Sequence, residues 1–300
     1  MDNLTHSLIG ALIGQTGLKK KTGLGMPALI IGANIPDIDA SCTIYGLESL
    51  AMRRGLTHGP LAMILLPLVL AGLLYGYDRW QVKRGKRPEG RLPVHFGWLF
   101  ALSLIGCLSH PFFDWLNSYG IRLLEPFSSQ WFYGDAIFII DIWMWIGLGL
   151  ATWLSLRRER QGREYRGIAQ IALGAVLFYV SYNVGLSWLM KRDAPATEII
   201  IPNPVPLAFW ERDVLRGDGQ GFWLVQGQRI GDMPLDQCDL ATARKADPRV
   251  DALLFWSRAP YVERTDDGGW LLGDARFALG GIGRFSVVMP AETCREGGAG

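Results

Sequence analysis

A histidine and an aspartate stand four residues apart in residues 109–120, which read SHPFFDWLNSYG. In a helix this spacing places the imidazole of His110 and the carboxylate of Asp114 on one face, where both can bind one metal ion. Pro111 lies between them, but proline is tolerated in membrane helices because neighbouring groups satisfy the freed carbonyl. The alternative is that the two residues only cap successive helical turns. Ionisable residues inside a membrane are costly and usually functional, so both interpretations stay open here.

Other candidate ligands lie at the ends of apolar stretches. His6 opens the first stretch, His58 opens the third, and Asp37-x-Asp39 follows the second. Imidazole and carboxylate together suit a divalent metal, with Zn first and Mn or Fe as alternatives. The hydroxyl residue before each histidine can support the ligand or simply cap a helix. We predict one metal centre with these ligands: His6, Asp37, Asp39, His58, His110 and Asp114, with Asp135 and Asp141 as second candidates.

Three residues near this centre are assigned to catalysis: Asp39, Asp114 and Arg54. An aspartate that does not coordinate the metal would serve as the base. Arg54 lies one turn before His58, and its planar guanidinium can hold a phosphate or a carboxylate. The alternative for Arg54 is a loop arginine at the level of the lipid headgroups. Asp141 stands inside an apolar run, so it must face a polar partner such as a metal or a histidine.

The composition indicates a membrane protein. Of the 300 residues, 49% are hydrophobic and 19% are charged, whereas about a quarter of an ordinary soluble domain is charged. The apolar residues concentrate before Met190. We therefore predict a membrane-embedded helical domain at residues 1–192 and a water-soluble domain at residues 193–300. The net charge of +2 gives no indication of nucleic-acid binding, and the polar start MDNLTHS predicts no cleaved signal peptide.

Six apolar segments are expected to form a helical bundle. Two of them, residues 4–18 and 24–35, are shorter than the roughly 20 residues that span a bilayer, and they would form a tight hairpin among longer helices. Four are near spanning length: residues 60–77, 96–113, 136–156 and 168–190. The expected fold class is thus mainly α, a polytopic bundle of about six membrane segments with a small β-rich domain outside the membrane.

The basic residues orient this bundle. Fourteen lysines and arginines fall in three loops, at residues 19–21, 79–91 and 157–166. The opposite loops carry three: Arg53, Arg54 and Arg122. The positive-inside rule places the basic loops in the cytoplasm of a bacterium and the C-terminal domain in the periplasm. Every candidate ligand then lies at the outer face of the inner membrane, which favours one shared site, while His95 lies on the cytoplasmic side and is left out.

The C-terminal domain alternates β-prone stretches with Gly and Asp-Gly turn signals, which indicates a small antiparallel β unit. Strands are expected at residues 198–201, 207–215, 222–226, 253–256, 270–272 and 285–288, and a frayed end at residues 295–300. Cys238 and Cys294 would share this domain in an oxidising compartment, so we expect them to pair. The sequence contains no CxxC pair, which argues against a thiolate zinc site.

Four blocks of the chain resemble a known family: residues 5–7 (THS), 34–39 (NIPDID), 54–58 (RGLTH) and 110–114 (HPFFD). With the tail motifs at residues 203–204 (NP), 255–258 (FWSR) and 274–277 (DARF), they are similar to the YdjM-type family of membrane-bound, metal-dependent hydrolases. The resemblance implies an inner-membrane protein that uses bound metal for hydrolysis. The chain has Arg53 and Gly59 where the family pattern has a histidine and a serine, so one ligand and one hydroxyl of that pattern are missing.

The predicted function is therefore a multi-pass membrane enzyme whose outer metal site activates water for hydrolysis. A site at headgroup depth favours a membrane lipid, or a lipid-linked phosphoester, as the substrate. One alternative is an ion- or solute-handling protein, although its binding residues would be expected near the midplane of the membrane. The other is a non-catalytic scaffold or regulator with a structural metal, whose protein partner the sequence does not indicate.

Overall fold

The computed structural model describes residues 1–195, 197–280 and 285–295. The chain separates into two compact units. The first unit holds Met1–Asp39, Arg54–Gly185 and Pro206–Phe209; the second holds Ala40–Arg53, Leu186–Val205 and Trp210–Gly300, as far as these residues are described. The chain thus passes between the units at several points, whereas the sequence predicted one boundary after residue 192.

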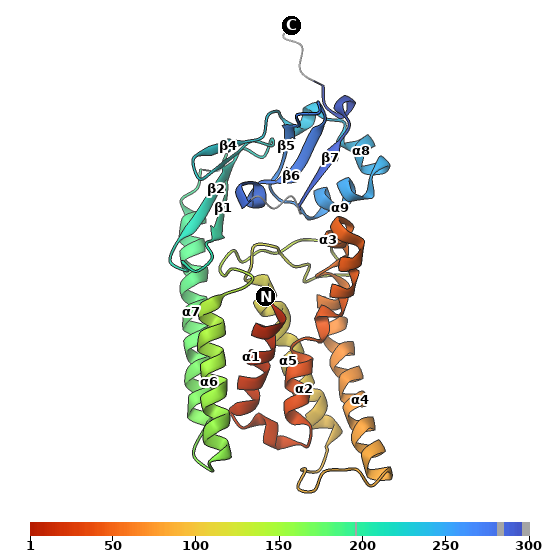
Figure 1. The fold of residues 1–300 in the computed structure, drawn as a ribbon, viewed down its shortest axis with the longest axis vertical. Coiled ribbons are helices and arrows are strands. Elements are labelled where there is room, and N and C mark those ends of the chain that lie inside the picture. The colour runs from red at the N-terminus through yellow and green to blue at the C-terminus, as the bar shows by residue number, and fades with distance from the viewer. Residues whose placement is uncertain (196, 281–284, 296–300) are drawn as a thin grey trace. The chain divides into compact units, whose positions relative to one another are not determined.

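The first unit is a bundle of helices, with 3₁₀ segments between its N-terminal helices and loops between the later helices (Figure 1). Its α-helices are α1 (Asn3–Gln15), α2 (Gly25–Gly32), α4 (Ala62–Lys83), α5 (Phe96–Trp115), α6 (Ile142–Arg160) and α7 (Arg166–Arg192), whose last residues from Leu186 belong to the second unit. The 3₁₀ segments are η1 (Leu18–Lys21), η2 (Ile35–Glu48), which begins in this unit, and η3 (Leu56–His58). Glycines bring α2 against α5, because a Cβ at Gly106 would lie 2.5 Å from the carbonyl oxygen of Leu29. This close packing brings the start of η2 next to the end of α5.

Among the described residues, three helices are long and apolar enough to span a membrane: α4, α5 and α7. The prediction of about six membrane segments is therefore not supported. α1 and α2 contain 13 and 8 residues, which at about 1.5 Å per residue is well short of a hydrocarbon core of about 30 Å. α6 has 19 residues, but its last turn carries Arg157, Arg158 and Arg160, so its apolar part is shorter still.

The three basic loops lie at the same end of the first unit (Figure 1). The ammonium groups of Lys19 and Lys20 lie 5.4 and 5.3 Å from the centroid of the Tyr165 ring. The amide of Gly23 donates to the carbonyl of Pro93 at 3.0 Å, which joins the first loop to the second. The N-terminus and the end of α5 lie at the opposite end of the bundle.

The second unit contains two antiparallel sheets. One has the order β1 (Ile199–Pro204), β2 (Arg212–Gly217), β3 (Trp223–Val225), β4 (Gln228–Ile230), and the other β5 (Pro260–Arg264), β6 (Trp270–Asp274), β7 (Ser286–Met289). Its helical segments are α3 (Ser49–Met52), η4 (Leu235–Gln237), α8 (Leu240–Ala246), α9 (Pro248–Trp256), η5 (Ala275–Gly280) and η7 (Ala291–Thr293). The small antiparallel β region is thus confirmed. The predicted frayed end lies outside the described residues, apart from Arg295.

The strand predicted at residues 253–256 is wrong, because these residues end α9. The helix starts at Pro248, and the Asp247 side chain accepts a hydrogen bond from the amide of Arg249. Proline in the first turn and aspartate at the N-cap are strong helix-start signals. The run of apolar residues is therefore the buried face of a short helix.

Two tail motifs form one buried network in the second unit. Arg276 donates from Nε to Asp274 Oδ1 at 2.8 Å and from Nη2 to Oδ2 at 2.7 Å. Both side chains are fully buried, and the Ser257 hydroxyl also donates to Asp274. The guanidinium of Arg276 lies 4.5 Å from the centroid of the Trp256 ring and 5.4 Å from that of Phe277. The FWSR and DARF motifs therefore support the packing of this unit.

A disulfide joins Cys238 to Cys294, which confirms the predicted pairing. The bond spans 56 residues, and a loop of that length stabilises a fold by about 4 kcal/mol in the chain-entropy model. The free cysteines of the described chain are Cys42 and Cys107. Alkylation of the denatured, unreduced protein should label two thiols, and reduction should raise the count to four. Four labelled thiols before reduction would contradict the pairing.

Candidate metal centre

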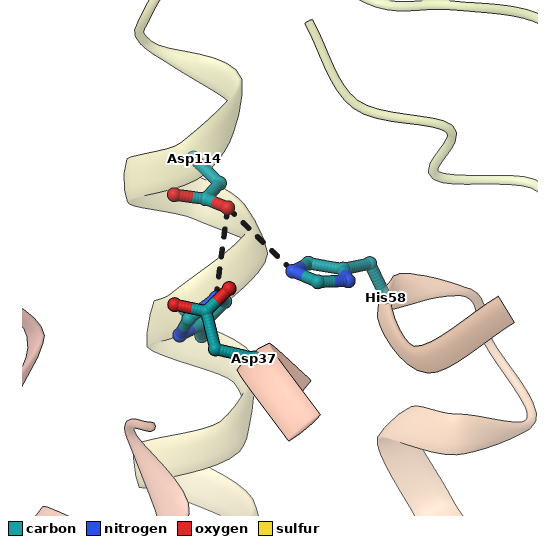
Figure 2. A group of neighbouring side chains, drawn as sticks. Asp37, His58 and Asp114 are labelled. Carbon is teal, nitrogen blue, oxygen red and sulfur yellow. Dashed lines mark ion pairs between the residues drawn. The ribbon is translucent and has the colours of Figure 1, made fainter. Parts of the chain in front are cut away.

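Four side chains of the first unit converge: Asp37, His58, His110 and Asp114. Each offers one ligand atom, and these atoms all lie within 4.8 Å of one another. Asp37 comes from η2, His58 from η3, and the other two from the last turns of α5. Figure 2 shows Asp37, His58 and Asp114 approaching one another from these separate segments. His58, His110 and Asp114 are buried and Asp37 is half-buried.

The distances between these atoms fit a shared ion. His58 Nε2 lies 3.5 Å from Asp114 Oδ2, and His110 Nε2 lies 3.6 Å from the same oxygen and 3.7 Å from Asp37 Oδ1. Good N–H···O hydrogen bonds measure about 2.7–3.2 Å, so these contacts are too long. Two ligand atoms that each lie about 2.1 Å from one tetrahedral ion are about 3.4 Å apart. The cluster therefore has the spacing of a metal site.

The hydrogen bonds of the two histidines direct their Nε2 lone pairs into the cluster. His110 Nδ1 lies 2.7 Å from the carbonyl oxygen of Ala33, which can only accept, so Nδ1 carries a proton. His58 Nδ1 lies 2.9 Å from Thr57 Oγ1, and that hydroxyl donates its own proton to Asp39 at 2.8 Å. Such partners fix the tautomer of a metal-binding histidine. With Nδ1 protonated, each imidazole presents Nε2 as a ligand atom once the ring is neutral.

Three buried atoms at the centre lack a hydrogen-bond partner. His58 Nε2, His110 Nε2 and Asp114 Oδ2 are buried and have no hydrogen-bond partner among the described residues. A buried polar atom without a partner costs about 1–3 kcal/mol, and such atoms are rare in native structures. Here all three face the same point. A cation bound there would satisfy all three at once.

The carboxylates of η2 are ionised at neutral pH. Burial raises the pKa of the Asp37 carboxyl, but the electrostatic interaction with the nearby His110 ring outweighs burial and lowers the pKa to about 2. Burial likewise opposes ionisation of Asp39, while the nearby His58 ring and the hydrogen bonds from Thr57 and the Arg54 amide hold its pKa below the usual value. Metal ligands must be deprotonated to bind. Both aspartates meet this condition.

Asp39 lies behind His58. Its Oδ2 atom accepts from the Arg54 amide and the Thr57 hydroxyl, both at 2.8 Å, and lies 3.5 Å from His58 Nδ1. Asp39 is therefore outside the group of four ligands that the structure brings together. It supports His58 from the side away from the cluster.

His6 and Arg54 surround Asp114. His6 Nε2 lies 3.3 Å from Asp114 Oδ1, and its ring stacks on His110 with 3.8 Å between centroids. The Met1 amino group pairs with the same oxygen. Arg54 Nε lies 3.3 Å from Asp114 Oδ2. His6 thus contacts Asp114 and His110 without belonging to the group of four. Arg54 forms an ion pair with Asp114.

Neither of the second candidates, Asp135 and Asp141, belongs to the group of four. Asp141 is the N-cap of α6 and accepts from the Met144 amide at 2.8 Å and from the Tyr179 hydroxyl at 2.7 Å. Its charge is therefore satisfied by protein donors. Asp135 is fully buried but is not one of the four converging residues. No sequence pattern indicates the Ala33 carbonyl as the partner of His110, because every residue has a backbone carbonyl.

Replacing Asp39 with asparagine is expected to weaken metal binding by about 10- to 100-fold, the usual effect of losing a partner that orients a metal-binding histidine. Competition with a chelator of known affinity measures the change in detergent-purified protein. The matched control is Asp193→Asn, because Asp193 is 86% exposed and in the second unit. Equal affinities for the two variants would show that Asp39 does not support the site.

Three apolar spans and a buried cluster of histidine and aspartate define a membrane protein that can hold a metal ion. The model of the YdjM inner membrane protein family matches residues 1–191. The match covers most of the chain, which therefore belongs to this family. All six predicted ligands lie within the matched residues. No curated protein and no solved structure matches the chain.

Proposed function

We propose that the protein is a membrane-bound, metal-dependent hydrolase. The observation that carries the proposal is the convergence of His58 Nε2, His110 Nε2 and Asp114 Oδ2, three buried atoms without a hydrogen-bond partner in the described chain. A divalent cation bound there supplies Lewis-acid chemistry, because it acidifies water and polarises a scissile phosphoryl or carbonyl group. Two imidazoles and two carboxylates suit Zn, and Mn or Fe are the alternatives.

The residues of the chain have separate tasks in this proposal. Asp37, His58, His110 and Asp114 hold the cation. Asp39 keeps His58 in the tautomer that binds, through Thr57. The left-handed backbone of Arg54, with φ of 56°, costs about 1–2 kcal/mol, and it accompanies the contact between the Arg54 guanidinium and Asp114. Arg54 thus positions a ligand, and its Nη1 also donates to Asn117 Oδ1 at 2.8 Å, which fixes the guanidinium beside Asp114.

Apolar side chains beside the ligands favour a lipid or lipid-linked substrate. Ile38, Leu56 and Phe112 stand one or two residues from ligands and are 62%, 64% and 41% exposed. Exposed apolar surface next to a polar centre is typical of a site that receives an apolar partner. A phosphoester on a lipid combines a group for the cation with a chain for this surface.

The proposed orientation places the basic loops in the cytoplasm and the metal centre and second unit in the periplasm. The support is the bias of fourteen basic residues against three, together with the gathering of the basic loops at one end of the bundle. A reporter enzyme that is active only in the periplasm should give signal when fused to the C-terminus. The same reporter inserted in residues 84–90 should stay silent. The reverse pattern would overturn the orientation.

Metal analysis joined to a hydrolysis screen tests the proposed function. Detergent-purified protein should contain a divalent metal, lose it to a chelator, and hydrolyse a phosphoester or lipid only in the metal-bound form. Adding back Zn or Mn should restore activity. Metal-loaded protein that hydrolyses no phosphoester or lipid would favour a structural metal in a scaffold or regulatory protein.

A further inference from the structure

An apolar groove separates α6 from α7 in the first unit. Its volume is about 320 Å³, and its walls include Met144, Gly147 and Leu148 on α6 and Ala172, Ala175 and Val176 on α7. Sites for small organic ligands measure about 300–1,000 Å³ and are mostly apolar. The groove therefore has the size and lining of a binding site.

Small residues create the groove. A Cβ added to Gly147 would meet no atom within 4 Å in the described structure, and alanines stand on the facing wall. Met144 and Leu148 also belong to a buried cluster with Ile9 and Leu12 of α1, and Ala172 and Val176 of α7 pack against the same cluster. The groove therefore lies between α6 and α7 beside this shared apolar core.

One end of the groove is polar and aromatic. The Tyr179 hydroxyl donates to Asp141 at 2.7 Å, and Trp143 Nε1 donates to the Leu207 carbonyl at 2.8 Å. The ring of Phe209 lies 6.2 Å from that of Trp143 and 5.2 Å from that of Tyr179. Tryptophan and tyrosine gather at the boundary between headgroups and hydrocarbon. This end therefore marks headgroup level, and the groove runs from it along apolar helix surface.

The membrane around the groove indicates which kind of molecule binds in it. α7 can span a membrane, and the chain belongs to an inner-membrane family, so the groove walls face hydrocarbon. Water is excluded because it needs two to four polar partners, which these walls lack. We propose that the groove binds one acyl chain of a membrane glycerophospholipid, with its headgroup at the end formed by Trp143 and Tyr179. This proposal stands independently of hydrolysis.

Crosslinking tests this assignment. The full chain is placed in nanodiscs that contain a phosphatidylethanolamine with a photoreactive group on one acyl chain, and the labelled peptides are mapped. Crosslinks should concentrate on residues 143–148 and 172–179. Gly147→Leu should reduce them about tenfold, because the leucine side chain would occupy the open space that the acyl chain needs. Gly149→Leu is the matched control, since this glycine also has open space around its Cβ position in the described structure but does not line the groove.

A second pair of variants covers the case in which Gly147→Leu does not fold. Ala175→Leu fills the groove from α7, and Gly174→Leu is its control outside the groove. Crosslinks that spread evenly over exposed residues such as Ile146 and Leu150, or that survive both groove variants, would overturn the proposal. Preferential labelling by a photoreactive free fatty acid in competition with the phospholipid would also overturn it.

Discussion

Replacing Asp114 with asparagine is expected to remove most of the bound metal from the folded protein. Asp114 Oδ2 is the atom that both His58 and His110 approach, so it is central to the site. Asparagine keeps the size of the side chain and removes its charge. Changes in supporting residues alone cost about 10- to 100-fold in affinity, so loss of a ligand should cost more than about 100-fold. Elemental analysis of metal per protein after gel filtration measures the loss.

Two further variants make this result interpretable. Asp114 also pairs with Arg54, so its substitution leaves a buried guanidinium short of a partner and can weaken the fold. His58→Ala removes a different ligand and leaves that ion pair intact. His95→Ala is the histidine control, because His95 precedes α5 at the other end of the helix. If Asp114→Asn and His58→Ala both retain wild-type metal in the monodisperse fraction, the cluster is a buried polar core and not a metal site.

The sequence indicated which residues gather, but not which of them face the centre. His110 and Asp114 share a helix face because they are four residues apart, and their side chains lie 3.6 Å apart. Asp37 and Asp39 were both predicted as ligands. They lie in a 3₁₀ segment, where three residues make a turn, so residues two apart point about 120° apart. Asp37 therefore faces the cluster while Asp39 faces Thr57, whereas in an extended strand residues two apart would share a face.

The fold was also only partly predictable, because local sequence patterns do not determine every element. Long apolar runs located α4, α5 and α7, but the apolar part of α6 ends where its arginines begin. In the second unit, residues 253–256 form a short apolar run whose periodicity does not distinguish a strand from a buried helix turn. The Asp247-Pro248 helix start was the signal that could have decided it. The placement of Ala40–Arg53 in the second unit depends on long-range contacts that no local pattern contains.

Replacing Arg276 with methionine is expected to destabilise the second unit by about 3–5 kcal/mol, because it leaves the Asp274 carboxylate buried without its cation. Hydrogen exchange of the β5, β6 and β7 peptides, measured by mass spectrometry on the full chain, reports the loss. The matched control is Arg244→Met, which breaks an exposed pair with Asp251. Exposed pairs contribute about 0–1 kcal/mol. Equal exchange in the two variants would show that the buried pair does not hold this unit together.

The same pair makes the second unit sensitive to acid. Burial raises the pKa of Asp274, but the charge of Arg276 and the hydrogen bonds from Arg276 and Ser257 outweigh burial and hold it below the usual value of 3.8. A carboxyl whose pKa is lower in the folded state stabilises the fold fully above its unfolded pKa and loses this contribution as the pH falls through the folded value. Protection of β6 should therefore fall below about pH 4 in the wild type. In the double variant Asp274→Leu/Arg276→Met, where no buried charge remains, the acid dependence should be weaker, and an undiminished dependence would assign it to other carboxyls.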